Sequence, residues 1–355
     1  MAQRSASRPA LGRRRQAAQQ PGPSRKSRRQ VMIEDHLRDA YDAVIVPFWR
    51  EKAYPISFRS TDGLEIRGMT FLQPRPETAI VISSGRTESF IKYKEFVYDL
   101  YLQGYSVFIA DHRGQGLSDR VLADEAKRQM GHVRNFQDYV SDLKQFYADF
   151  VRPTGHRKHL LLGHSMGGCI ASLYLETHDQ DFDAAVLCSP MDELALGFFP
   201  LFARVAIDVE EWIGRDEEYA PNQHGYDENE KFSDKCLTHS EVRWDLMRRE
   251  YADNPAAKLG GPSVLWVKLA QGAGKNARES AANVKVPVLL LQAGKDTIVE
   301  PEGQLEFRER LNETRPGFCR LERIEGARHE IFMESDLYRQ PAFELTLDFI
   351  RNQVP

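Results

Sequence analysis

The stretch HLLLGHSMGGCIASLYLE, residues 159–176, determines how this chain is expected to fold. It begins with a short apolar run, continues through GHSMGG at 163–168 and ends in a segment compatible with a helix. A strand that turns sharply into a helix needs small neighbours, and the residues two positions before and after Ser165 are both glycines. Such a turn projects the serine hydroxyl out of a sheet and directs the helix N-terminus, with the Met166 N–H, at the space in front of it. The motif therefore predicts a strained turn that presents a nucleophilic serine.

Short apolar runs alternate with amphipathic helical stretches on both sides of this motif. The apolar runs lie at 79–83, 106–111, 184–188 and 286–292, and a last strand is expected at 318–324. Strands this uniformly apolar are typical of a sheet that helices cover on both faces. The series of strand, helix and strand therefore predicts an α/β fold with a doubly wound, mostly parallel sheet.

A helix and two antiparallel strands are expected before the first parallel strand. From Val31, apolar residues recur at steps of three and four, which predicts a helix that ends at Pro47. Residues 56–60 and 64–72 read as strands, and Thr-Asp-Gly at 61–63 is a hairpin signal between them.

The alternation of strands and helices stops after Pro190 and resumes near residue 284. We expect one core built from residues 31–190 and 284–355, with residues 191–283 inserted as a helical cap. The insertion carries two apolar helical faces, formed by Leu201, Phe202, Val205, Val209, Trp212 and Ile213 and by Trp244, Leu246, Met247 and Tyr251.

Residues 1–30 form a basic tail with nine basic side chains and no acidic one. The other residues carry 39 basic and 52 acidic side chains, so the remainder of the chain is acidic. A segment this polar cannot bury enough surface to offset its chain entropy, so we expect it to be disordered. A tether to nucleic acid or anionic lipid, an organelle transit peptide and a dispensable tail are the alternatives. We favour the dispensable tail because no aromatic residue lies among the arginines.

Composition limits the class of protein. The mean hydropathy is −0.52, and the sequence has no run of about 18 apolar residues that would span a membrane. The four cysteines lie far apart without a CxxC motif, which indicates free thiols rather than disulfides or a zinc site. We expect a cytoplasmic protein; peripheral membrane contact and the oligomeric state stay open.

Serine is a weak nucleophile at neutral pH, so Ser165 requires a base and an acid that orients the base. In this topology the acid and then the histidine follow the serine, at the carboxyl ends of later strands. Asp296 follows the apolar run at 286–292, and His329 follows the last expected strand. We therefore predict Ser165, Asp296 and His329 as a catalytic triad, with Glu300 as the alternative acid.

The oxyanion formed by attack of the serine needs a second N–H donor besides Met166. The loop after the run at 79–83 contains Gly85, which allows close backbone approach, and we predict that the Arg86 N–H is this donor. The glycine-rich segment 111–118 follows the next strand, and we expect it to brace the site rather than to react.

Five segments together carry a family resemblance. They are GHSMGG at 163–168, DHRGQGLS at 111–118, the loop at 85–88, QAGKDTIV at 292–299 and GARHE at 326–330. From roughly residue 50 onward the chain resembles the lysophospholipase and monoacylglycerol lipase group of α/β-hydrolases. Two cap segments, LTHSEVR at 237–243 and GGPSVLWV at 260–267, are similar to its bacterial lysophospholipase branch.

The resemblance implies the α/β-hydrolase fold and a serine hydrolase that cleaves lipid-like carboxylic esters, lysophospholipid or monoacylglycerol, through an acyl-enzyme on Ser165. It implies no metal and no cofactor. Monoacylglycerol lipases usually carry His-Gly at the oxyanion loop, where this chain has Ser84-Gly85. A general carboxylesterase remains an alternative. So does a peptidase of the proline-iminopeptidase kind, because residues 208–235 hold ten acidic side chains that could bind a free amino terminus.

The cap is expected to select the substrate. Phe198, Phe199 and Phe202 belong to a stretch rich in large apolar residues, and we predict that they contact the substrate. Contact with a lipid surface and burial against the sheet are the alternatives for this stretch. A small-molecule or lipid ester is the expected partner, and no nucleic acid is expected.

Overall fold

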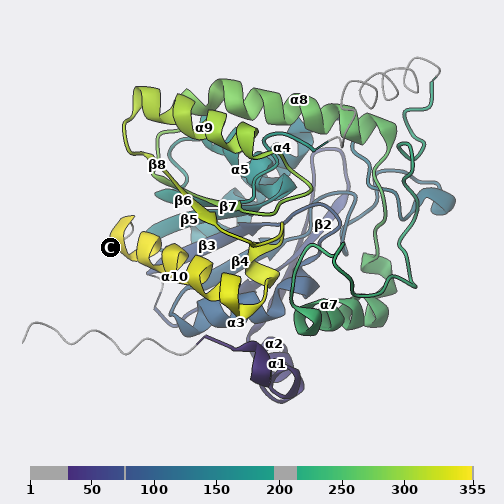
Figure 1. Ribbon diagram of the computed structural model, residues 1–355, viewed down its shortest axis with the longest axis horizontal. Coiled ribbons are helices and arrows are strands. Elements are labelled where there is room, and N and C mark those ends of the chain that lie inside the picture. Colours follow the sequence, from purple (N-terminus) through teal and green to yellow (C-terminus); the bar gives the residue numbers. More distant parts are fainter. Residues whose placement is uncertain (1–30, 76, 196–213, 354–355) are drawn as a thin grey trace, which may run out of the picture. The chain divides into compact units, whose positions relative to one another are not determined.

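The computed structural model describes residues 31–75, 77–195 and 214–353, and these ranges form one compact unit. Their strands make a sheet in the order β1-β2-β4-β3-β5-β6-β7-β8 (Figure 1). The strands are β1 Tyr54–Arg59, β2 Glu65–Phe71, β3 Thr78–Ser83, β4 Ser106–Ala110, β5 Lys158–His164, β6 Ala184–Cys188, β7 Val288–Ala293 and β8 Cys319–Ile324. β2 is antiparallel to β1 and β4, and all other neighbours are parallel. The predicted doubly wound, mostly parallel sheet is confirmed.

Helices cover both faces of this sheet. Those described are α1 Glu34–Ala40, α2 Val46–Lys52, α3 Lys94–Leu102, α4 Gln137–Phe146, α5 Met166–Thr177, α7 Glu241–Asp253, α8 Val264–Ser280, α9 Pro301–Thr314 and α10 Asp336–Gln353. Figure 1 shows α4, α5, α8 and α9 on one face and α3 and α10 on the other. None of the helices in the described ranges has the length and apolar character needed to cross a membrane.

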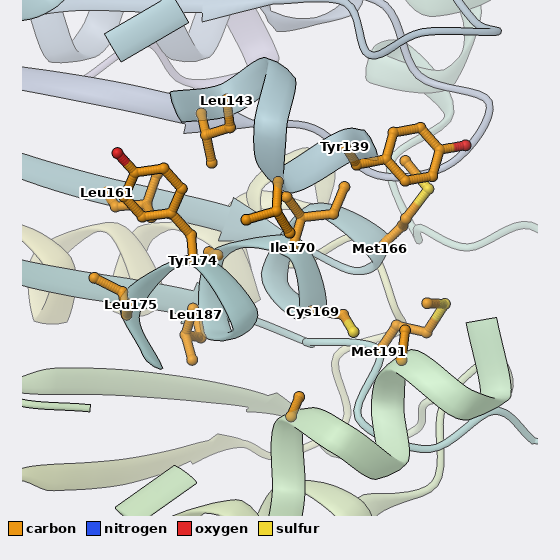
Figure 2. Packing of buried hydrophobic residues seen from close by; sticks show 14 of the residues in the cluster. Tyr139, Leu143, Leu161, Met166, Cys169, Ile170, Tyr174, Leu175, Leu187 and Met191 are labelled. Atoms are coloured by element: carbon orange, nitrogen blue, oxygen red, sulfur yellow. The ribbon is translucent and has the colours of Figure 1, made fainter. Parts of the chain in front are cut away.

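Each face of the sheet has its own apolar cluster. On the α5 side, Leu161 of β5 and Leu187 of β6 lie together with Ile170 and Tyr174 of α5, as Figure 2 shows, and all four are fully buried. Burying one such side chain contributes about 1.5–3 kcal/mol to folding. The continuous apolar strands predicted from the sequence are therefore buried from both sides, which fixes β5 and α5 as the rigid support of Ser165.

The N-terminal helix extends further than predicted. It does not end at Pro47, because α2 continues to Lys52. A π-helical turn at Tyr41–Ile45 precedes it, and the Val46 N–H bonds the carbonyl of Tyr41. Proline has no N–H and is tolerated in the first helical turn, so a change of helical register just before Pro47 allows the chain to continue.

The predicted cap, 191–283, contains two described helices with different surroundings. α8 packs against α5 and α9 and so lies in the helix layer of the sheet. α7 packs against α1 and the short helical turn Phe90–Tyr93. Residues 196–213, which include the first predicted cap helix, lie outside the described residues, as does the basic tail 1–30. The limits of the cap remain a prediction.

A buried arginine attaches α7 to the core. The Arg243 guanidinium is fully buried and donates to both carboxylate oxygens of Glu95, at 2.9 and 2.8 Å. It also donates to Asp336 Oδ1 at 2.8 Å and to the Glu334 carbonyl at 2.7 Å. α7 is thereby held to α3 and to the start of α10.

We expect Arg243→Met to lower the free energy of unfolding by about 3–5 kcal/mol, because it leaves buried carboxylates without their partner. Arg249→Met is the matched control, since Arg249 lies on the same helix and pairs with Asp42 at the surface. An exposed pair contributes about 0–1 kcal/mol. Urea unfolding followed by tryptophan fluorescence measures both, and equal small losses would contradict this role of Arg243.

Candidate active site

Ser165 lies at the junction of β5 and α5 with an unusual backbone. Its φ and ψ are 53° and −119°. Residues other than glycine rarely adopt this backbone conformation, which costs about 1–3 kcal/mol. Two hydrogen bonds fix this conformation, from the Ser165 N–H to the Cys188 carbonyl at 3.0 Å and from the Met191 N–H to the Ser165 carbonyl at 2.9 Å. The predicted strained turn is confirmed.

The two flanking glycines are required by contact distances. A Cβ atom at position 163 would lie 2.5 Å from the Gly167 carbonyl oxygen. One at position 167 would lie 2.0 Å from the Ser83 carbonyl oxygen at the end of β3. Any larger residue would push α5 away from the sheet and displace Ser165.

The structure brings the three predicted triad residues together. The Ser165 Oγ lies 2.9 Å from Nε2 of His329, and Nδ1 of the same ring lies 2.8 Å from Oδ2 of Asp296. Asp296 follows β7 and His329 follows β8, so both come from the carboxyl ends of parallel strands. This is the arrangement of nucleophile, base and orienting acid that activates a serine.

The environment of Asp296 keeps its carboxylate ionised. Burial alone would raise the pKa of this carboxyl, but the hydrogen bond with His329 lowers it. The N–H groups of Ile298 and Val299 add hydrogen bonds of 2.8 and 3.1 Å to Oδ1, so the pKa lies below its ordinary value. An ionised Asp296 accepts a hydrogen bond from Nδ1–H of His329, which leaves Nε2 of the ring free to accept the serine proton.

A cavity of about 590 Å³ opens in front of Ser165 and His329. One wall is apolar and is formed by Met191, Leu194, Ala195, Ala220, Pro221, Pro262, Trp266, Val267 and Ile298. The loop 85–88 also lines the cavity. Met191, which Figure 2 shows near Met166, joins this cavity to the apolar cluster below. Phe198, Phe199 and Phe202, predicted to contact the substrate, lie outside the described residues.

The loop that carries Arg86 is held from several sides. Gln115 donates to the Gly85 carbonyl at 2.8 Å and to the Glu88 carbonyl at 3.0 Å, which confirms the bracing role predicted for segment 111–118. The Tyr251 hydroxyl of α7 donates to the Thr87 carbonyl at 3.0 Å. The Arg86 guanidinium bonds a carbonyl of the segment before α8 and lies over the Trp266 ring.

A buried group of charged side chains lies beneath this loop, and the sequence analysis missed it. Glu88 accepts a hydrogen bond from the Gly85 N–H. It also forms an ion pair with Lys92, in which Nζ lies 2.6 Å from Oε1. Lys92 also pairs with Glu330 at 2.8 Å, and His164 Nδ1 lies 3.2 Å from Glu88. Ion pairs thus join the loop 85–88, the turn at Ser165 and the residue after His329. The spacing of Glu88 and Lys92 by four residues was the available signal.

Among the described residues, no group of three or more His, Cys, Asp or Glu side chains is placed to hold a metal ion. The four cysteines are free and buried, as predicted. Burial raises the pKa of Cys319 to about 12, and the pKa values of Cys169 and Cys188 also lie well above their ordinary value.

Comparison with known families places the chain. Residues 74–336 match the family described as serine aminopeptidase S33. The chain belongs to this family. It is 34% identical over 318 residues to lysophospholipase L2 of Escherichia coli K12, which covers 86% of this chain and 89% of that protein. It is also 24% identical to a monoacylglycerol lipase of Mycolicibacterium smegmatis, over 79% of this chain and 88% of that protein.

Solved structures share the fold. A thermostable carboxyl esterase from Bacillus coagulans superposes with a TM-score of 0.67 at 18% identity, covering 86% of this chain and 99% of that one. A monoglyceride lipase from Saccharomyces cerevisiae gives 0.62 at 19% identity, over 85% and 96%. The chain is therefore a serine hydrolase with the α/β-hydrolase fold.

The ion pair of His164 with Glu88 is expected to make stability depend on pH. Burial lowers the pKa of His164, but Glu88 raises it by more, so the pKa lies above its ordinary value near 6.5. A raised pKa contributes stability that is fully present below about pH 6.5 and is lost as the pH rises through the folded value. The destabilisation caused by His164→Gln should therefore be larger at pH 6 than at pH 9.

Urea unfolding of the wild type and of His164→Gln at pH 6 and pH 9 measures this difference. His156→Gln is the matched control, because burial lowers the pKa of His156 to about 4 and keeps the ring neutral over this range. Its destabilisation should follow the opposite trend and be smaller at pH 6 than at pH 9, because the unfolded ring, with a pKa near 6.5, binds a proton at pH 6 that the folded ring does not. A pH-independent effect of His164→Gln would show that the pair with Glu88 is not ionic.

Proposed function

We propose that this chain hydrolyses the fatty-acid ester of lysophospholipids by way of an acyl-enzyme on Ser165. The observation that carries the proposal is that Ser165, His329 and Asp296 are linked by hydrogen bonds and that Ser165 and His329 line a cavity with many apolar residues. The similarity to lysophospholipase L2 over most of both chains supports lysophospholipid in preference to monoacylglycerol.

The residues have distinct roles in the proposed reaction. Ser165 Oγ attacks the ester carbonyl while His329 Nε2 takes its proton, and Asp296 stabilises the resulting imidazolium. The alcohol then leaves with the proton held by His329. Water attacks the acyl-enzyme by the same route in reverse, which releases the fatty acid and restores Ser165.

The N–H groups of Met166 and Arg86 bind the oxyanion in both halves of this cycle. Met166 is the first residue of α5, where the N–H groups of a helix have no partner within the helix. Gly85 permits the close approach of the loop, because a Cβ there would lie 3.0 Å from the Glu88 carboxylate and 3.1 Å from His164. Removing one such donor typically costs about 10²–10³ in kcat.

The apolar wall is suited to an acyl chain, since ligand pockets of about 300–1,000 Å³ bind mainly through apolar contact. The predicted contribution of Phe198, Phe199 and Phe202 to the acyl site belongs to this proposal. Peripheral contact with a membrane also belongs to it, because lysophospholipids are found at lipid surfaces.

The test compares four substrates with the purified full chain: lysophosphatidylcholine, a monoacylglycerol of the same acyl chain, p-nitrophenyl butyrate and prolyl p-nitroanilide. We expect the fastest release from lysophosphatidylcholine. Ser165→Ala should lower kcat by about 10⁶ and Asp296→Asn by about 10⁴. Glu300→Gln, the alternative acid, is the matched control and should retain activity.

Each other outcome contradicts a defined part of the proposal. Activity on p-nitrophenyl butyrate alone would indicate a general carboxylesterase. Cleavage of prolyl p-nitroanilide would indicate a peptidase. Loss of activity in Glu300→Gln with retention in Asp296→Asn would overturn the assignment of the acid.

A further inference from the structure

A second cavity of about 410 Å³ adjoins the cavity at Ser165. The two share six lining residues, Arg86, Thr87, Glu88, Gln223, Leu237 and Glu330. These shared residues include the oxyanion loop and the residue after His329. The two cavities therefore meet at the loop 86–88 and at Glu330, next to the catalytic residues.

The two cavities differ in chemistry. The first has the apolar wall described above, whereas the second is lined by four acidic and four basic side chains together with Tyr226, Trp244 and Tyr251. Its inner end is formed by the buried Glu88 and Lys92, and its outer end by exposed residues of the segment before α7. An ester with one apolar and one polar part matches this division.

Arg248 of α7 is held in place within the second cavity. Its guanidinium lies 4.6 Å from the centre of the Tyr226 ring and 5.5 Å from that of Trp244. It donates to the carbonyls of Asp227 and Glu228 at 2.8 and 3.0 Å. These contacts orient a cation that is largely buried, with 14% of its side chain exposed. Guanidinium groups that are fixed in this way bind phosphate oxygens strongly.

Charges of both signs surround Arg248. Lys235 lines the outer part of the same cavity, and its ammonium forms no ion pair with any residue in the described ranges. The carboxylates of Asp227 and Glu230 line it too; the nearest contact of Glu230 to Arg248 is 3.5 Å. The cavity therefore offers a largely buried cation, Arg248, an exposed cation, Lys235, and two exposed carboxylates, which suits a zwitterion better than a simple anion.

We propose that this second cavity binds the zwitterionic phosphodiester head group of the lysophospholipid. Arg248 and Lys235 contact the phosphate, and the carboxylates of Asp227 and Glu230 contact the ammonium group. The inference rests on the proposed function and extends it, because it assigns the head group to one cavity and the acyl chain to the other. After acylation of Ser165, the glycerophosphodiester leaves through the second cavity.

The experiment uses the head group without its acyl chain. sn-Glycero-3-phosphocholine should inhibit the hydrolysis of p-nitrophenyl butyrate by the full chain, whereas glycerol should not. Arg248→Gln should raise the inhibition constant about tenfold, because it removes a charged hydrogen-bond donor. Lys235→Gln should raise it about threefold. Lys235 is exposed, so this second variant tests the proposal even if Arg248→Gln fails to fold.

Arg249→Gln is the matched control, since it removes the same charge from the next residue of α7, which pairs with Asp42 and does not line the cavity. Its inhibition constant should equal that of the wild type. The rate of each variant on p-nitrophenyl butyrate without inhibitor is the reference for its inhibition constant.

Three results would overturn the inference. The first is that glycerophosphocholine does not inhibit the wild type, and the second is that it inhibits the wild type and both cavity variants equally. The third is that glycerol 3-phosphate inhibits as strongly as glycerophosphocholine, because the cavity would then be a site for anions alone. In each case Ser165-dependent hydrolysis of p-nitrophenyl butyrate would still show a working esterase. Failure of the proposed function can be distinguished from these results, because the wild type would then not hydrolyse lysophosphatidylcholine.

Discussion

The close contact between β5 and α5 around Ser165 is the constraint on which the rest of the structure depends. The Ser165 backbone is held in a costly conformation because glycines at 163 and 167 let the helix and the neighbouring strand approach without side chains between them. Buried leucines of β5 and β6 and the apolar face of α5 supply the stabilisation that offsets this cost. The same turn presents both the nucleophile and the N-terminus of a helix.

The second organising feature is the group of buried charges next to the loop 85–88. Glu88 and Lys92 lie in one segment and Glu330 and His164 in two others, and their pairing links the loop 85–88 to the turn of Ser165 and to the loop of His329. Removing Lys92 would leave the carboxylates of Glu88 and Glu330 without their shared cation, so the loops are expected to keep one mutual arrangement. This arrangement also sets the boundary between the apolar and the charged cavity.

The order of elements and the triad could be predicted from the sequence because their signals are local. The parallel strands β3, β4, β6 and β7 are almost entirely apolar, and each triad residue follows a parallel strand of the sheet. The pairing of Lys92 with Glu330 could not be predicted, since the two residues lie 238 positions apart and nothing in the sequence pairs them. The continuation of the first helix past Pro47 depends on a single change of register that periodicity does not show. The charged cavity could not be predicted either, because it depends on contacts of Arg248 with two aromatic rings and two backbone carbonyls that only the folded chain brings together.

The central claim is that Ser165 is the activated nucleophile of this fold. The most direct measurement is reaction of the native protein with a fluorophosphonate, followed by digestion and mass spectrometry of the peptides. The account predicts a single phosphonylated residue, Ser165, and no reaction of the unfolded chain, in which His329 and Asp296 no longer activate it. Modification of a different serine, or none in the folded protein, would contradict it.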